Sequence, residues 1–160
     1  MDIEKQNNNK SICNILFGPS DAPEVAYKDC GMFLYTLAKY FNWNSNYVYY
    51  KTRESDTVWN QEFSSYVNTV CIGETSDYKK QIELAKLYLR EHIHEFDVIM
   101  FFNYGSTVWK LAKYCKQLKP DIVVYSKLDM GIGGFEHFCG NKPFMWLRNY
   151  AEKLKSQYVD

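Results

Sequence analysis

The sequence predicts an α/β fold, in which a doubly wound, mostly parallel sheet of about five to six strands lies in a three-layer Rossmann-like arrangement. Residues 98–102 form an unbroken apolar run of strand length, and residues 122–125 form another. Between them, apolar residues recur at helical spacing, at Val108, Leu111, Ala112, Cys115 and Leu118. Two strands covered on both faces and one amphipathic helix make a parallel crossover, which is almost always right-handed.

The first half of the chain also alternates strand and helix patterns. Residues 12–17 are typical of a strand and are followed by a turn-rich loop at 18–24. Residues 29–41 have a helical pattern that is apolar on most sides, so we expect this helix to be well buried. Further strands are predicted over residues 46–51 and 67–72. The polar segment between those two strands has no assigned element.

The second half continues this alternation, with recognisable ends to its helices. Ser76 or Asp77 can cap a helix that runs to about residue 95. Ser106 can cap the helix of the crossover, and Pro120 comes after the point where that helix must have ended.

The chain is predicted to be a single domain over residues 12–160, after a disordered lead-in at 1–11. A length of 160 residues with 46% hydrophobic and 24% charged residues is typical of one globular domain. A last helix capped by Asn141 is expected near its end. Residues 158–160 could begin a sixth strand, which would suggest that a longer parent protein has been cut short.

Composition and charge argue against several classes of protein. The 19 basic and 19 acidic residues give a formal net charge of zero, so nucleic acid is not an expected partner. The five cysteines are scattered without a CxxC pair, which favours reduced thiols in a cytoplasmic protein over a disulfide framework or a zinc site. Cys13, Cys71 and Cys115 lie in apolar runs and are expected to be buried and inert. The sequence has neither a signal-peptide pattern nor an apolar run long enough to span a bilayer.

The familiar nucleotide and metal motifs are absent from the sequence. No GxxxxGK[ST] motif occurs, and the first predicted strand is followed by GPSDAPE in place of GxGxxG. The glycine-rich loop at 131–134 could let its backbone approach a phosphate, or it could be a flexible turn. His92 and His94 are two residues apart on a helix and so point in different directions. No metal site is therefore predicted.

Polar residues converge on the edge of the sheet where the strands end. Lys28, Asp29 and Gly31 lie where the first loop enters the first helix, whose amino end directs N–H groups toward this edge. Lys127 and Asp129 follow the fifth strand. Ligands of open α/β sheets bind at this edge, so the residues can hold a phosphate, a carboxylate or a polyhydroxylated ligand. Asp29 could equally cap the helix, and Lys127 could pair locally with Asp129.

The predicted last helix leaves two alternatives open. It mixes apolar residues with four basic ones, Lys142, Arg148, Lys153 and Lys155. Such a helix can pack on the sheet, or it can make a peripheral contact with an anionic membrane surface, which for a cytoplasmic protein is the inner face of the membrane.

The sequence resembles the amino-terminal half of bacterial two-domain glycosyltransferases of the GT-B type, close to family 4. The likeness runs from about residue 12 to the end of the chain. It is carried by Tyr-Lys-Asp-Cys-Gly at 27–31, by Asp-Val-Ile-Met-Phe-Phe-Asn at 97–103, and by Val-Tyr-Ser-Lys-Leu-Asp at 124–129. In that family this half binds the acceptor, whereas the other half binds the nucleotide-sugar donor and carries a characteristic pair of glutamates.

The resemblance implies a metal-independent sugar transfer in a cleft between two domains, with the second domain supplied in cis or in trans. This chain would bind a sugar or glycan acceptor, would need no cofactor of its own, and would be inactive alone. Many relatives have a histidine where this chain has Asn103, so no acid–base role is implied there. The implied acceptor-binding residues are Gly18, Lys28, Asp29, Gly31, Asn103, Tyr104, Lys127 and Asp129. The alternative is a non-catalytic Rossmann-like module that binds a nucleotide or a sugar.

Overall fold

The structure is a computed structural model and describes residues 9–18, 20–52, 58–102, 106–127 and 158. Within these residues the chain forms one sheet of five parallel strands. The strands are β1 (Ser11–Ile15), β2 (Asn44–Lys51), β3 (Val67–Glu74), β4 (Val98–Phe102) and β5 (Val123–Lys127). The helices are α1 (Pro23–Ala26), α2 (Asp29–Phe41), α3 (Gln61–Tyr66), α4 (Tyr78–His92), the short 3-10 helix η1 (Ile93–Glu95) and α5 (Ser106–Leu118).

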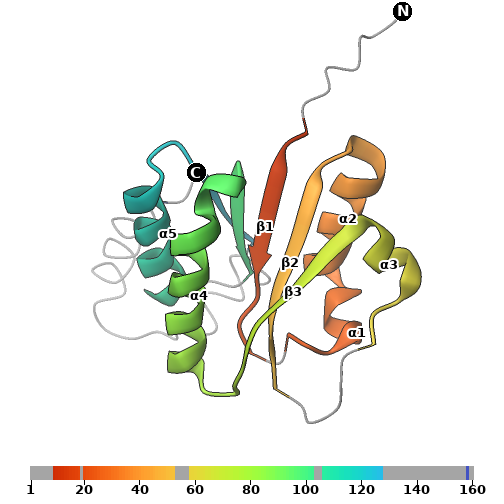
Figure 1. Cartoon of the computed structure of the whole chain (residues 1–160), viewed down its shortest axis with the longest axis horizontal. Helices are drawn as coiled ribbons and strands as arrows, with labels where there is room; N and C mark the ends of the chain where they lie inside the picture. Colours follow the sequence, from red (N-terminus) through yellow and green to blue (C-terminus); the bar gives the residue numbers. More distant parts are fainter. Residues whose placement is uncertain (1–8, 19, 53–57, 103–105, 128–157, 159–160) are drawn as a thin grey trace, which may run out of the picture.

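Helices cover both faces of this sheet, as Figure 1 shows. On one face α2 packs against β1 and β2, α1 packs against α2, and α3 packs against α2 and β3. On the other face α4 and α5 lie side by side. The predicted three-layer, doubly wound α/β fold is therefore confirmed for the described residues.

In the strand order, β3-β2-β1-β4-β5, the direction in which successive strands are added reverses between β1 and β4, which we call the reversal point. The chain moves outward from β1 through β2 to β3, then crosses back to β4 and moves outward again to β5. Because all the strands are parallel, their carboxyl ends meet at one edge of the sheet, which we call the carboxyl edge. In open α/β folds ligands bind at this edge, next to the reversal point.

The central strand β1 divides the core into two clusters. Cys13, Ile15 and Phe17 point toward α4 and α5, where they join the larger cluster. Ile12 and Leu16 point toward α2 and join the smaller one. This alternation follows the period of two of a strand, and β1 has no exposed face because all of its residues are buried.

The helix α2 has the predicted bounds but is not well buried. Its buried residues are Cys30, Gly31 and Leu34, whereas Phe33 is 42% exposed and Phe41 is 63% exposed. One face of a helix is enough to cover a sheet, so Phe33 and Phe41 lie away from it. The capping position is occupied by Lys28, without a side-chain hydrogen bond, and Asp29 is the first residue of the helix, so the alternative that Asp29 is the capping residue does not hold.

Another difference is α3, which lies in the polar segment that had no assigned element. The side chain of Asn60 caps this helix by accepting hydrogen bonds from the backbone N–H groups of Glu62 and Phe63. A helix of six residues is too short to establish an amphipathic period, so only its cap could have revealed it. The longer α4 has its predicted cap, because Asp77 accepts from the N–H groups at the start of that helix.

The cysteine predictions are only partly confirmed. Cys13 and Cys115 are buried, and burial raises the pKa of the Cys115 thiol to about 12 and that of Cys13 well above its ordinary value. Cys71 is exposed, because it lies on β3 at the edge of the sheet. The described residues contain no cluster of histidine, cysteine and acidic side chains that could hold a metal ion.

The end of the chain is described only at Tyr158. This residue lies in a helical turn and not in the expected sixth strand; its ring packs against the larger core and lies 5.6 Å from the ammonium of Lys113. The predicted last helix, the glycine-rich loop at 131–134 and most of the lead-in lie outside the described residues. None of the described helices combines the length and apolar character that a membrane span requires.

Candidate functional site

The carboxyl edge next to the reversal point is built around Gln81, which is fully buried in the first turn of α4. Its side-chain oxygen accepts a hydrogen bond from the N–H of Gly18 at 2.9 Å. Its amide nitrogen donates to the carbonyl oxygen of Thr75 at 3.0 Å and to that of Gly18 at 3.5 Å. One side chain therefore joins the loop after β1 to the end of β3, and it engages the N–H of Gly18 that a ligand could otherwise use.

The loop after β1 also closes over the end of β2. The Ser20 hydroxyl accepts from the N–H of Tyr50 at 3.2 Å. The buried carboxylate of Asp21 accepts two hydrogen bonds from Thr52, from its N–H and from its hydroxyl, both at 2.7 Å. Sequence reasoning missed these residues and Gln81. The serine and aspartate of GPSDAPE were the available clue, because polar residues after a buried strand must find partners when a loop folds inward.

The amino end of α2 supplies the exposed part of this edge. Lys28 and Asp29 are both exposed at the first turn of a helix of 13 residues. The positive end of the helix dipole and the Lys28 ammonium favour hydroxyl oxygens or an anion, and the Asp29 carboxylate can accept hydrogen bonds from hydroxyl groups. Asp29 also interacts with another group of the protein.

Gly31 has a structural explanation that differs from the predicted one. It is buried, and a Cβ atom added at this position would lie 2.0 Å from the carbonyl oxygen of Ala26. The absence of a side chain therefore lets α2 approach α1. This contact accounts for the glycine without any ligand.

The other predicted residues come from the far side of the reversal point. Lys127 ends β5 in register with Phe102 at the end of β4, so its backbone lies at the carboxyl edge. Asn103, Tyr104 and Asp129 lie outside the described residues. The structure thus brings Gly18, Lys28 and Asp29 to the same edge as the end of β5.

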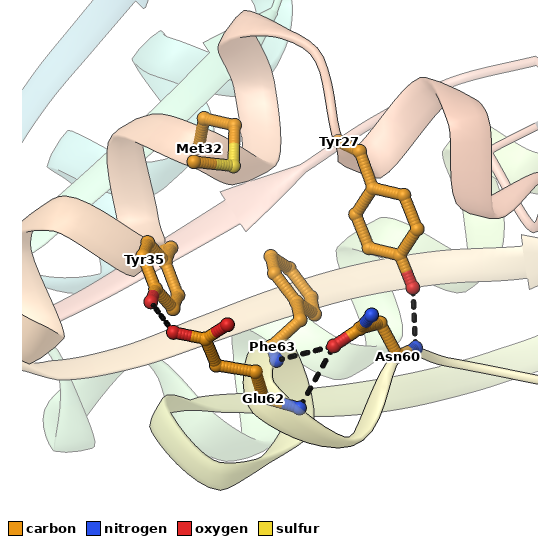
Figure 2. A pocket seen from close by; sticks show the side chains of 6 residues that line it. All are labelled: Tyr27, Met32, Tyr35, Asn60, Glu62 and Phe63. Atoms are coloured by element: carbon orange, nitrogen blue, oxygen red, sulfur yellow. Dashed lines mark hydrogen bonds between the residues drawn. The ribbon is translucent and has the colours of Figure 1, made fainter.

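A separate pocket of about 220 Å³ lies on the α2 side of the molecule, between α2 and α3. It is lined by Tyr27, Met32, Tyr35, Asn60, Glu62 and Phe63, which Figure 2 shows around a common space. Sequence reasoning missed this pocket because it depends on α3. The run of aromatic residues between 27 and 66 was the only indication of it.

A network of three polar side chains joins the walls of this pocket. The Lys39 ammonium donates to Glu62 Oε1 at 2.8 Å and to the Tyr35 hydroxyl at 2.5 Å, and that hydroxyl donates to Glu62 Oε1 at 2.5 Å. The hydrogen bond from Lys39 lowers the pKa of Glu62, and the hydrogen bond to Glu62 raises the pKa of Lys39 and of Tyr35. Lys39 and Glu62 therefore stay charged, and Tyr35 stays neutral, around neutral pH.

This network should hold α3 against α2 over a wide pH range. A carboxyl with a lowered pKa stabilises the fold fully above its ordinary value of 4.5, and the effect is lost as the pH falls through the lowered value. The raised pKa of Tyr35 sets the alkaline end of this range. The hydroxyl of Tyr35 contributes fully to stability below pH 10.0, its ordinary pKa, and this contribution is lost as the pH rises through the raised value. We expect the NMR amide shifts of residues 60–66 to stay constant between these limits.

Below this range, protonation of Glu62 should change the amide shifts of the wild-type chain. The matched comparison is the Glu62→Gln variant, in which this change at acidic pH should disappear. A transition of the wild-type α3 amides inside the interval, or the same change at acidic pH in Glu62→Gln, would show that other groups control this helix.

Comparison of the chain with protein-family models, with curated proteins and with solved structures found no match.

Proposed function

We propose that this chain is the acceptor-binding domain of a glycosyltransferase of the GT-B type, which holds a saccharide or another hydroxyl acceptor at its carboxyl edge. The observation that supports the proposal most strongly is the reversal of strand order between β1 and β4, with Lys28 and Asp29 exposed at the adjoining helix end. An ammonium donor beside a carboxylate acceptor suits the hydroxyl groups of a sugar, which both donate and accept hydrogen bonds.

The proposal assigns the chemistry of transfer to a second domain, in cis or in trans. That domain would bind the nucleotide-sugar and supply the catalytic groups, as the sequence resemblance implies. In this chain, Lys28 and Asp29 would orient the acceptor, and Lys127 at the end of β5 would approach it from the other side of the reversal point. A cytoplasmic location, with contact at the inner face of a membrane through the last predicted helix, belongs to the same proposal.

The loop after β1 favours a sugar over a nucleotide at this edge. Dinucleotide sites use N–H groups of the first loop to approach a pyrophosphate. Here the N–H of Gly18 donates to Gln81, and the side chains of Ser20 and Asp21 bond to Tyr50 and Thr52 at the end of β2. The alternative of a nucleotide-binding module therefore lacks its usual phosphate contact at this loop.

Replacing Lys28 should weaken acceptor binding without loss of stability. We expect Lys28→Ala to lower the affinity for an oligosaccharide, selected on a glycan array and measured by calorimetry, by about tenfold, because a charged hydrogen-bond donor is removed. Lys10→Ala is the matched control, since it removes the same charge at the opposite edge, where β1 begins. Equal losses in both variants would show a nonspecific charge effect.

The same binding assay separates the proposal from its alternative. The wild-type chain should bind a glycan and show no thermal shift with UDP-, GDP- or ADP-sugars, because the donor site belongs to the other domain. Thermal stabilisation by a nucleotide or nucleotide-sugar, with no glycan bound, would overturn the proposal in favour of a nucleotide-binding module.

A further inference from the structure

The pocket between α2 and α3 has the lining of a carbohydrate site. Three aromatic rings form its walls: Phe63 lies 5.6 Å from Tyr27 at an angle of 70°, and 6.5 Å from Tyr35 at an angle of 13°. Tyr27 is 37% exposed and Met32 is 41% exposed, so apolar surface is available to a ligand. The C–H face of a sugar ring is apolar and packs on such rings, whereas its edge carries hydroxyl groups.

Polar groups beside these rings are available for the hydroxyl groups. Both hydrogen bonds that Glu62 accepts use its Oε1 atom, and its side chain is 64% exposed. The other carboxylate oxygen, Oε2, can therefore accept from a ligand. Asn60 uses its side-chain oxygen to cap α3, which leaves its amide nitrogen available as a donor. Figure 2 shows Asn60 beside Tyr27 and Glu62 beside Tyr35, among the residues that line the pocket.

The charges in the pocket favour a neutral ligand. The Glu62 carboxylate is already paired with the Lys39 ammonium at 2.8 Å, and this ammonium also lies 5.0 Å from the centre of the Tyr35 ring. The Lys39 ammonium beside the Tyr35 ring would repel a ligand cation, and the Glu62 carboxylate would repel an anion. Neither a quaternary ammonium nor a phosphate fits this arrangement.

The size and support of the pocket fit one ring of a ligand. A volume of about 220 Å³ is below the range of roughly 300–1,000 Å³ for sites that take drug-sized ligands. The walls are fixed in advance, because Phe63 is 3% exposed and the N–H of Asn60 donates to the Tyr27 hydroxyl. Little ordering is then needed on binding.

We propose that the pocket between α2 and α3 is a second carbohydrate site, which takes a single neutral pyranose ring by packing its C–H face on the exposed ring of Tyr27 and bonding its hydroxyl groups to Glu62 and Asn60. This site is separate from the proposed acceptor site at the carboxyl edge and does not depend on it.

The test is an NMR titration of the ¹⁵N-labelled chain with the methyl glycosides of glucose, galactose, mannose and N-acetylglucosamine, and with tetramethylammonium chloride as the cationic comparison. We expect saturable shifts of the amides of residues 27, 32–35 and 60–63 with at least one glycoside, with a dissociation constant of about 1 mM, and none with tetramethylammonium. No glycoside-induced shift in these residues, or a response to tetramethylammonium alone, would overturn the proposal.

Variants at two tyrosines make the test specific. Tyr27→Ala should weaken glycoside binding by about fivefold or more, because it removes a packing face, whereas Tyr27→Phe keeps the ring, loses only the hydroxyl that accepts from Asn60, and should weaken binding less. Tyr40→Ala is the matched control, since Tyr40 is 68% exposed on α2 and does not line the pocket. Equal weakening in Tyr27→Ala and Tyr40→Ala would contradict the proposal, and so would binding that Tyr27→Ala leaves intact.

The Lys28→Ala variant tests the pocket separately from the proposed acceptor site at the carboxyl edge. Shifts at residues 60–63 that persist in Lys28→Ala would support the pocket whether or not an acceptor binds at the edge. If all glycoside-induced shifts vanish in Lys28→Ala, the pocket is not a separate site, and this proposal fails while the one at the edge stands.

Discussion

Gly31→Ala is expected to destabilise the domain by about 3 kcal/mol, because the added methyl group has no room. The new Cβ atom would lie 2.0 Å from the carbonyl oxygen of Ala26 and 2.8 Å from its carbonyl carbon, and both are backbone atoms. They cannot rotate away as a side chain would, so α1 must move from α2. Urea unfolding followed by circular dichroism measures the loss.

The matched control is Gly18→Ala, which changes a glycine of the other kind. Gly18 has a φ of 87°, and no atom lies within 4 Å of its added Cβ, so the cost should be backbone strain of about 1 kcal/mol. If Gly31→Ala had full stability but lost binding at the carboxyl edge, the glycine would be a ligand contact and the packing explanation would be wrong.

Gln81→Leu should cost about 3 kcal/mol, because it leaves partly buried backbone groups without partners. The N–H of Gly18 and the carbonyl oxygen of Thr75 both bond to this side chain, which is fully buried. Leucine has a similar volume, so the loss measures hydrogen bonding more than packing. The free energy of unfolding in urea gives the total, and hydrogen exchange of the Gly18 amide should accelerate before global unfolding.

Gln61→Leu is the control for Gln81→Leu, since residue 61 is an exposed glutamine at the start of α3. Its stability should change by no more than about 0.5 kcal/mol. If Gln81→Leu is as stable as this control, the link between the loop after β1 and the end of β3 does not support the carboxyl edge, and our account of that edge is wrong.

The sequence predicted the fold well because its apolar periods are long. The helix α2 has the predicted bounds, and α5 follows the apolar spacing between Val108 and Leu118. The strand β4 also has the predicted bounds, since its five residues are apolar without interruption. Burial on both faces gives a run that cannot be mistaken for a loop, and parallel order follows from the alternation with helices.

The candidate sites were less predictable, because they depend on contacts between distant residues. The buried role of Gln81 follows from its position opposite Gly18, which is 63 residues away in the sequence. The pocket requires Tyr27 and Tyr35 to meet α3, a helix too short to have a period of its own. No local pattern encodes such pairings. Gly31 illustrates the same limit, because its closest contact is with the backbone of another helix.

The central claim is that the carboxyl edge binds the hydroxyl groups of an acceptor and not a nucleotide. The most direct measurement is an NMR titration of the ¹⁵N-labelled chain with an oligosaccharide selected on a glycan array and, separately, with UDP-glucose. We predict that the oligosaccharide shifts the amides of Lys28 and Asp29, that these shifts are lost in Lys28→Ala, and that UDP-glucose leaves the edge unchanged. Shifts of the same amides by UDP-glucose, with no response to any oligosaccharide, would contradict the claim.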